Sequence, residues 1–550
     1  MPELVRFFNA NVIADFAGDD VTGNEVTGDK VAGELFSYRG QLIDQARFEQ
    51  LAQNTKAEQI DLRRSWVIPG FRDAHCHPLF AGREAAGLHL DGCVTTEDVL
   101  QRLTEYREAN PALTWIDGAV YERSMLAGKE LEAASLLDRV EDQVPVVLHA
   151  DDHHTLWVNT AALRAAGLES PEQVAALNAS FGHGSIDIDS NGNATGILRE
   201  WEAMSLVLDI APKPTLDEDV AFLIWSQRQM MANGLVAATD AWIDPGMTEV
   251  YLAALERDQL WMRFELGFRF APENWREYRD YALKMRAEVE SRANPLLTAR
   301  TAKFFVDGVF GSATAAVHED YLQPSHSGDF RGNLVWQQDE LIQALSWAAE
   351  NGFKLHLHAI GDAGVTAAID AIIAVGSPAR SVIAHTELVR EGDFDRMARH
   401  GIIANFEPFW AQQNAMLKSC VPRLGNARVD RMYEMRKAID SGVTITFGSD
   451  WPVSSFVPLE GLQVAVTRAP LAHPDQSWTL HSAPTRKEAL AAYTTAVATQ
   501  MADADRGALN PGARADFVVL SENPLTAAAE KLTQINVLAT VIDGQVRFSA

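Results

Sequence analysis

The sequence predicts an α/β fold in which a TIM-type (β/α)8 barrel is joined to a small β domain. Three observations support this prediction. Apolar, strand-like runs alternate with amphipathic helical stretches through the middle of the chain, as they do in parallel βαβ units. These runs number eight, which is the number of strands that closes such a barrel. Both ends of the chain are instead rich in short β-branched runs.

Helices separate most of the eight predicted barrel strands, for example Asp339–Asn351 and Ala363–Val375. The strands are predicted at residues 66–74, 236–242, 262–270, 300–307, 354–360, 381–386, 402–408 and 443–449. The stretch from about 80 to 235 is too long for one crossover helix, so we expect an inserted subdomain after the first strand, at about residues 110–205. The barrel with this insertion is predicted to span residues 66–496.

The two ends of the chain, residues 1–65 and 497–550, are predicted to meet in one small β-sandwich-like domain. Phe7–Ile13 is a strand candidate, and a Gly- and Asp-rich loop follows at residues 15–33. Near the C-terminus, Asp516–Leu520 and Val537–Ile542 are further β-branched runs. The second of these runs is followed by Asp543-Gly544, the strongest short signal for a β-hairpin.

Composition excludes several classes of function. The chain has 550 residues and a formal net charge of -28, which argues against nucleic-acid binding because phosphate contacts need a basic face. This charge also disfavours anionic membrane surfaces, and no apolar stretch approaches the roughly 20 residues that span a bilayer. Three cysteines, Cys76, Cys93 and Cys420, give no disulfide framework. A reducing, cytoplasmic location is therefore expected.

The first chemical signal is Asp73-Ala74-His75-Cys76-His77, which closes the first predicted barrel strand. Residues i and i+2 of a strand face the same side, so His75 and His77 are expected to point together into the barrel mouth. Two converging imidazoles form half of a site for a divalent transition metal. Cys76 is expected to point away and pack. An HxH pair alone occurs often by chance, so this motif needs partners.

Three later strand ends supply such partners. His358 closes the fifth predicted strand, His385 closes the sixth and Asp450 follows the last. The carboxyl ends of barrel strands meet at one rim, where side chains are typically catalytic. The order HxH, His, His, Asp therefore predicts a metal centre. His356 lies one step deeper on the face of His358, and we expect it to be a packed core histidine.

This order of motifs resembles the amidohydrolase superfamily, and most closely its amidohydrolase-3 group of N-substituted formamide deformylase-like enzymes. The similarity extends from near residue 5 to near residue 545. It is carried by Pro69–His77, Lys303–Gly308, His358–Asp362, Ala384–His385, Gly448–Pro452, and the tail from Gly507–Gly512 to Phe517. Residues 152–162 resemble the group's inserted segment, with His153 replacing its usual glycine. The pair Phe304-Phe305 is bulkier than the usual pattern.

The resemblance implies a set of metal ligands. His75 and His77 would bind one ion, and His358 and His385 would bind a second or shared ion. Lys303 falls where the family often has a bridging lysine carboxylated by carbon dioxide; a carbamate has two oxygens that can span two metals, whereas an ammonium cannot ligate. The alternative is an ion-paired Lys303 beside a single metal. We therefore expect one or two divalent ions, with zinc as the default and iron or manganese as alternatives.

Asp450 is expected to be both a metal ligand and the catalytic proton shuttle, because a carboxylate beside a metal-activated water can take up its proton. The alternative role for Asp450 is an N-cap before Pro452. His154, in the inserted segment, and Asp307, on the strand face of Lys303, are candidate substrate contacts. Structural roles are the alternatives for both.

These residues together predict a metal-dependent hydrolase that cleaves a C–N bond in an amide, N-formyl or cyclic amide group, with metal-bound hydroxide as the nucleophile. Deamination, or hydrolysis of an ester or lactone, would use the same site. A metal-binding or regulatory protein without catalysis is the alternative from another class. The expected partner is a small-molecule substrate, and a homodimer is compatible with the sequence.

Overall fold

The computed structural model describes residues 3–16, 31–90, 92–151, 153–181, 184–324 and 330–550. Most of the predicted Gly- and Asp-rich loop, residues 17–30, lies outside these ranges. The chain divides into two compact units. One consists of Met1–Pro78 and Leu223–Ala550, and the other is Leu79–Phe222. The insertion predicted at 110–205 falls within the second unit, and its boundaries stay predictions.

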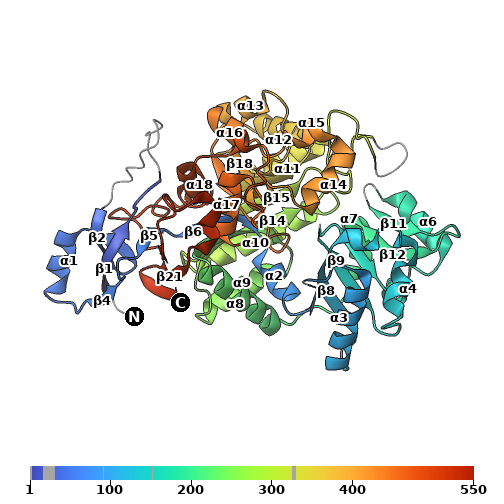
Figure 1. The fold of residues 1–550 in the computed structure, drawn as a ribbon, viewed down its shortest axis with the longest axis horizontal. Helices are drawn as coiled ribbons and strands as arrows, with labels where there is room; N and C mark the ends of the chain where they lie inside the picture. The colour runs from blue at the N-terminus through green and yellow to red at the C-terminus, as the bar shows by residue number, and fades with distance from the viewer. Residues whose placement is uncertain (1–2, 17–30, 91, 152, 182–183, 325–329) are drawn as a thin grey trace. The chain divides into compact units, whose positions relative to one another are not determined.

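A nearly closed barrel of eight parallel strands forms the centre of the first unit (Figure 1). Its strand order is β19-β18-β17-β16-β15-β14-β13-β6. The strands are β6 (Phe71–Cys76), β13 (Leu235–Ile243), β14 (Arg263–Phe270), β15 (Leu297–Phe305), β16 (Lys354–Ala359), β17 (Val382–His385), β18 (Ile403–Phe406) and β19 (Ile445–Phe447). Just after β19, the backbone N–H groups of Ser449 and Asp450 donate to the carbonyl of His75 in β6. The predicted α/β barrel is therefore confirmed.

Helices follow most of the barrel strands, including the two predicted ones, observed as α11 and α12. α10 shows why these segments are helical: Trp275, Tyr278, Ala282, Met285 and Val289 are buried at spacings of three or four, so they form one apolar face. The helices of this unit are α1 (Gln45–Ala52), α8 (Leu216–Ala232), α9 (Met247–Glu256), α10 (Trp275–Ser291), α11 (Gln338–Glu350), α12 (Asp362–Ala374), α13 (Asp393–Arg399), α14 (Ala415–Leu424), α15 (Asn426–Val429), α16 (Met435–Asp440), α17 (Pro458–Thr467), α18 (Arg486–Ala492) and α19 (Thr495–Gln500).

One predicted strand boundary is wrong. The single strand predicted at residues 66–74 is two strands, β5 (Trp66–Pro69) and β6, which belong to different sheets. The chain crosses between the sheets at Gly70. A Cβ atom there would lie 2.3 Å from Cγ1 of Val236, so only glycine fits the close approach of the two segments. The continuous apolar run hid this break because both halves are buried.

Strands from both ends of the chain form a second eight-stranded sheet, ordered β22-β21-β20-β5-β1-β2-β3, with β4 also paired to β1. Its other strands are β1 (Leu4–Val12), β2 (Val31–Tyr38), β3 (Gln41–Ile43), β4 (Glu58–Asp61), β20 (Phe517–Leu520), β21 (Val537–Ile542) and β22 (Gln545–Ser549). Asp543 and Gly544 join β21 to β22 with φ of 50° and 72°, as a type I′ hairpin requires. The sheet fits the small terminal domain, whose boundaries at 65 and 497 stay predictions.

The second unit is built on its own six-stranded sheet, ordered β11-β12-β10-β9-β8-β7. Trp157 of β10 is fully buried in an apolar cluster that includes Tyr121 and Leu148. The strands are β7 (Leu88–His89), β8 (Ile116–Tyr121), β9 (Val146–Ala150), β10 (Thr155–Val158), β11 (Ser185–Ile188) and β12 (Ala194–Arg199). The helices are α2 (Pro78–Glu84), α3 (Thr96–Ala109), α4 (Ala133–Asp138), α5 (Thr160–Ala165), α6 (Pro171–Ser180) and α7 (Glu200–Leu208).

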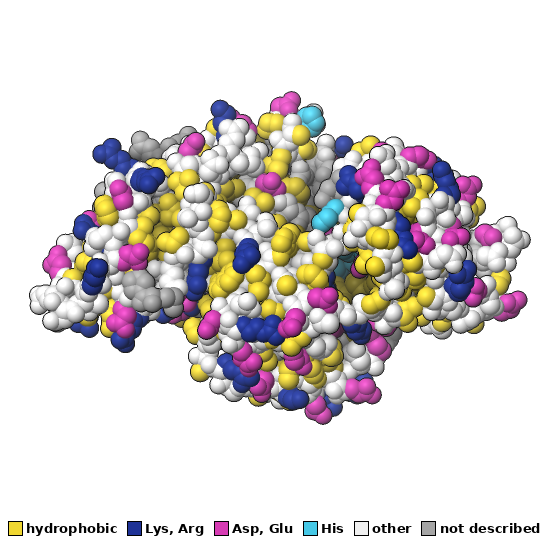
Figure 2. All heavy atoms as spheres, turned by 90° about the horizontal axis from the view of Figure 1, so that it is seen from below, with side chains coloured by type: hydrophobic (Ala, Val, Ile, Leu, Met, Phe, Trp, Pro, Cys, Tyr) yellow, Lys and Arg dark blue, Asp and Glu magenta, His cyan; other side chains and the backbone are white. Residues whose placement is uncertain are grey.

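The surface carries both signs of charge. On the face drawn in Figure 2, Lys and Arg side chains lie interspersed with Asp and Glu side chains. Among the described residues, no helix has the length and apolar character needed to cross a membrane.

Buried ion pairs join the first barrel strand to the C-terminal segment. The Arg72 guanidinium in β6 lies 3.2 Å from a carboxylate oxygen of Asp503 and 3.6 Å from one of Asp516. Asp503 also binds Arg263 of β14. These side chains are at most 7% exposed, and burial lowers the pKa of Arg72 to about 10 despite both acids. Removal of Asp503 would take this carboxylate from Arg263 and leave Arg72 with Asp516 alone, so two buried cations would lose compensation.

We therefore expect Asp503→Asn to lower the free energy of unfolding by about 3–5 kcal/mol in urea denaturation of the full chain. The matched control is Glu3→Gln, which breaks the exposed ion pair with Arg39 and should change this free energy by less than about 1 kcal/mol. Equal effects of the two substitutions would contradict the structural role of the buried network.

Candidate metal centre

Two imidazoles and one carboxylate converge at the carboxyl end of the barrel. His75 of β6, His385 of β17 and Asp450 after β19 each offer one ligand atom, and these atoms lie within 4.8 Å of one another. All three residues are buried. His75 Nε2 and Asp450 Oδ1 are 3.3 Å apart. A tetrahedral ion with bonds of about 2.0–2.1 Å separates its ligand atoms by roughly 3.3 Å. The donor set therefore fits a divalent cation.

His77 adjoins this group. Its Nε2 lies 2.9 Å from Asp450 Oδ1, and its Nδ1 lies 3.8 Å from Asp240 Oδ1. The predicted convergence of His75 and His77 is thus observed, since both imidazoles reach the same carboxylate oxygen. Cys76, between them, points the other way, and its Sγ lies 3.6 Å from the carbonyl oxygen of Thr239. This confirms its packing role.

Lys303 lies in the same interior layer. It is fully buried, and its Nζ is 3.4 Å from His75 Nε2 and 4.8 Å from the ring centre of Phe305. Burial lowers the pKa of Lys303 to about 7, although Asp450 and Glu407 oppose the shift. A substantial fraction of this amine is therefore uncharged at neutral pH, which is the form that can react with carbon dioxide.

His358 and Asp307 lie beside the centre. His358 packs against His385 with ring centres 4.5 Å apart, but its Nε2 faces the carbonyl oxygen of Gly308 at 3.3 Å. The carboxylate of Asp307 accepts hydrogen bonds from three backbone N–H groups, those of Ala316, Ile360 and Gly361. Burial raises the pKa of Asp307 to about 7. Because these backbone donors already occupy the carboxylate, a structural role for Asp307 is favoured over a substrate contact.

The backbone turns sharply at two of the three converging residues. His385 has φ of 74° and Asp450 has φ of 53°, which is the left-handed region that non-glycine residues seldom adopt. Such conformations persist only where surrounding contacts hold them, and they cluster at functional sites. Asp450 is held by its backbone N–H bond of 2.8 Å to His75. The N-cap alternative for Asp450 is wrong, because the next helix, α17, starts at Pro458.

Electrostatics keep Asp450 ionised. Burial acts to raise the pKa of this carboxyl group, but the hydrogen bonds from His75 and His77 outweigh it and hold the pKa well below its usual range. The pKa of His75 is itself lowered well below its usual value, by burial first and then by Lys303. An ionised carboxylate beside the uncharged imidazole of His75 is the protonation state that metal coordination requires.

Two further buried residues contact the imidazoles of the centre. His356, predicted to be a packed core residue, is buried but places its Nε2 2.9 Å from His75 Nδ1. Glu407, which no motif singled out, is fully buried and places Oε2 3.0 Å from His385 Nδ1. One signal for Glu407 was available: it is an acid at the end of the apolar run predicted as the seventh strand, 402–408.

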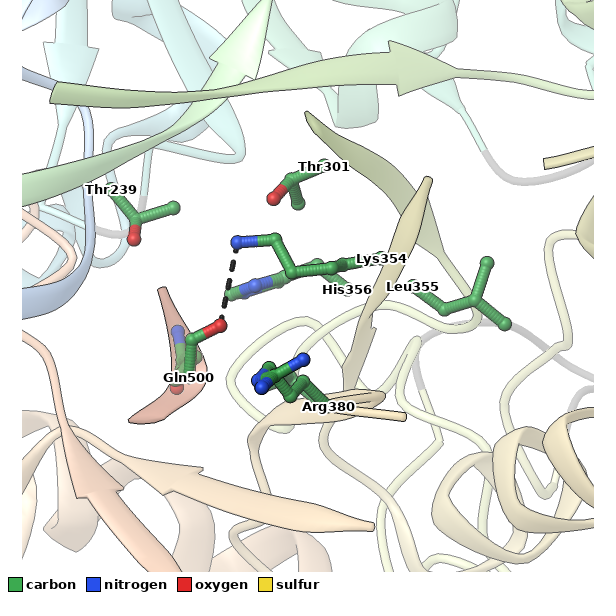
Figure 3. Close-up of a pocket in the computed structure, with 8 residues that line it drawn as sticks. Thr239, Thr301, Lys354, Leu355, His356, Arg380 and Gln500 are labelled. Carbon is green, nitrogen blue, oxygen red and sulfur yellow. Dashed lines mark hydrogen bonds between the residues drawn. The ribbon is translucent and has the colours of Figure 1, made fainter. Parts of the chain in front are cut away.

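A small pocket is lined by the first residues of β16 together with residues of β13, β15 and β17 (Figure 3). Lys354, the first residue of β16, donates from Nζ to the carbonyl oxygen of Gln500 at 3.3 Å. His356 links this pocket to His75. The lining residues are Thr239, Thr301, Lys354, Leu355, His356, Arg380, Val382 and Gln500.

His154 belongs to the second unit. Its Nδ1 lies 2.7 Å from Oε2 of Glu200, and both side chains are mostly buried. Glu200 has φ of 61° and His153 has φ of 51°, a left-handed backbone conformation that residues other than glycine seldom adopt.

The chain is similar to several known proteins. The sequence profile of the Amidohydrolase family matches residues 58–548. The chain is 27% identical to Protein LONG AFTER FAR-RED 3 of Arabidopsis thaliana, covering 88% of this chain and 83% of that one. It is 26% identical to N-substituted formamide deformylase of Arthrobacter pascens, covering 90% of each. A crystal structure of an uncharacterized metal-dependent hydrolase from Pyrococcus horikoshii OT3 superposes with a TM-score of 0.75 at 22% identity, covering 96% of this chain and 99% of that one.

Because His385 converges with His75 and Asp450, removal of its imidazole should lower the metal content of the protein. We expect His385→Ala to deplete the bound divalent metal in elemental analysis of purified protein, because one of two imidazole ligands is lost. His473→Ala, which removes an exposed histidine, is the control and should retain the full content. Full occupancy in the His385 variant would remove this residue from the ligand set.

Proposed function

This chain belongs to the amidohydrolase family, and we propose that it is a metal-dependent hydrolase of a C–N bond in an amide, N-formyl or cyclic amide group. The observation that carries the proposal is the convergence of His75, His385 and Asp450 on one point at the barrel rim. The name of the relative from Arthrobacter pascens, N-substituted formamide deformylase, supports the choice of bond. The expected substrate is a small molecule.

His75, His385 and Asp450 would hold one divalent ion, with His77 beside them as a further ligand. Zinc is the default identity because two imidazoles and a carboxylate suit it. A second ion would require His358 to turn from Gly308 and Lys303 to carry a carbamate. When bound, such an ion polarises a carbonyl group and lowers the pKa of water.

Asp450 performs the proton transfer in this proposal. Its carboxylate is ionised and its Oδ1 is oriented by His75 and His77, so it can accept a proton from the attacking water. The same oxygen then delivers that proton to the leaving nitrogen, which departs as an amine. His154, oriented by Glu200, is proposed as a substrate contact. We assign Asp307 a supporting role, since a substrate would have to displace one of its backbone donors.

Products identify the bond that is cleaved. A panel of N-formyl compounds, N-acyl amino acids and cyclic amides should release a carboxylate together with an amine. Release of ammonia would indicate a deaminase, and turnover of esters or lactones alone would indicate an oxygen-ester hydrolase. Bound metal without turnover on any of these compounds would indicate a metal-binding protein without catalysis.

Asp450→Asn tests the proton transfer. The amide cannot accept the proton, so we expect kcat to fall by about 10²–10⁴. The variant should retain most of its metal, measured by elemental analysis, because the imidazole ligands remain. Undiminished turnover in the metal-loaded variant would remove Asp450 from the proton transfer.

Carboxylation of Lys303 is tested by carbon-13 NMR. Protein prepared with labelled bicarbonate should show a carbamate carbon signal that is absent from Lys303→Met. Because burial lowers the pKa of this amine to about 7, we expect the signal to persist at neutral pH. A spectrum that is identical for the two proteins would leave Lys303 as an ordinary buried amine.

A further inference from the structure

Glu407 is a buried carboxylate whose position calls for an explanation. It directly follows β18 and is fully buried. An ionised carboxylate in such surroundings is unfavourable unless a hydrogen-bond donor compensates it. The donor is His385, whose Nδ1 lies 3.0 Å from Oε2. Glu407 thus contacts Nδ1 of a proposed metal ligand, which would leave Nε2 to bind an ion.

The chemistry of this contact selects one form of the imidazole. A neutral histidine carries one N–H group and one lone pair, on different nitrogens. Oε2 of Glu407 lies 3.0 Å from Nδ1 of His385, and a carboxylate that accepts this hydrogen bond leaves the proton on Nδ1 and the lone pair on Nε2. A metal ion binds the lone pair. The contact therefore presents His385 in its ligating form before any ion arrives.

The stacking of Trp410 and the backbone conformation of His385 fix the plane and direction of the same ring. The indole of Trp410, in the turn that follows Glu407, stacks on the imidazole with an interplanar angle of 8° and ring centres 5.5 Å apart. The left-handed backbone at His385, φ 74°, directs the side chain from the end of its strand. Glu407 determines which nitrogen of the ring carries the proton. Stacking and backbone conformation do not determine this.

His75 has a related but weaker restraint. Its Nδ1 contacts His356 Nε2 at 2.9 Å, and either imidazole can be the donor in that pair. The contact with His356 therefore does not by itself determine which nitrogen of His75 keeps its lone pair, and the other nitrogen, Nε2, lies 3.3 Å from Asp450 Oδ1. Glu407 differs from His356 because only an acceptor without protons makes the outcome unambiguous.

We propose that Glu407 is a positioning residue that holds the Nε2 lone pair of His385 ready for the metal ion. This inference rests on the proposed function only in taking His385 as a ligand. It concerns metal affinity rather than turnover, and it assigns Glu407 no contact with the substrate.

The test measures the tautomer of His385 and the metal affinity of the apoprotein. Long-range proton–nitrogen NMR of histidine-labelled apoprotein should show the His385 proton on Nδ1, with signals identified by comparison with His385→Asn. Glu407→Gln, whose amide can also donate to Nδ1, should weaken zinc binding by about 10–100-fold in competition with a chelator. The matched control is Glu387→Gln, at the neighbouring strand end.

Glu387 is a suitable control because it is also a buried glutamate, and it follows the end of the strand next to that of Glu407. Zinc affinity in that variant should stay within about threefold of the unmodified protein. A His385 proton on Nε2 in the unmodified apoprotein would overturn the inference, even if Glu407→Gln failed to fold. Equal losses of affinity in the two variants would also overturn it. A protein that binds zinc as described but hydrolyses no C–N bond would refute the proposed function alone.

Discussion

Asp450 is an ionised carboxylate enclosed by a protein barrel, and most of the surrounding structure compensates for that charge. Its Oδ1 lies 2.9 Å from His77 Nε2 and 3.3 Å from His75 Nε2, and Lys303 is buried in the same layer. Burial alone would neutralise such a group, but the imidazoles prevent this. Imidazoles facing a carboxylate are also the donors that a divalent cation prefers. One electrostatic constraint thus gives both the low pKa of Asp450 and the geometry of the metal centre.

The barrel meets this constraint through strand geometry. Alternation within a strand points His75 and His77 to one side, and parallel strands bring residues far apart in sequence to one rim. At His385 and Asp450 the side-chain direction does not follow from strand alternation alone, because both residues have positive φ. Two buried residues contact the imidazoles at Nδ1: Glu407 contacts Nδ1 of His385, and His356 contacts Nδ1 of His75.

Much of this arrangement could be predicted from the sequence, since it depends on short-range patterns. The eight apolar runs predicted the barrel strands, apart from the break at Gly70. Of the four motif ends, those with His75, His385 and Asp450 place ligand atoms within 4.8 Å of one another, whereas His358 faces Gly308. The limits are equally physical. The break at Gly70 depends on the approach of Val236, which comes from a distant segment. The saturation of Asp307 depends on backbone donors of Ala316, Ile360 and Gly361, which no side-chain pattern records. Glu407 acts through one tertiary contact.

The central claim is that His75, His385 and Asp450 hold one divalent cation. Anomalous diffraction from metal-loaded crystals, recorded at the absorption edge of the bound metal, tests this claim most directly. We predict an anomalous peak at about 2.0–2.2 Å from an imidazole nitrogen of each histidine and from a carboxylate oxygen of Asp450. A peak elsewhere in the molecule, with none between these three side chains, would contradict the account.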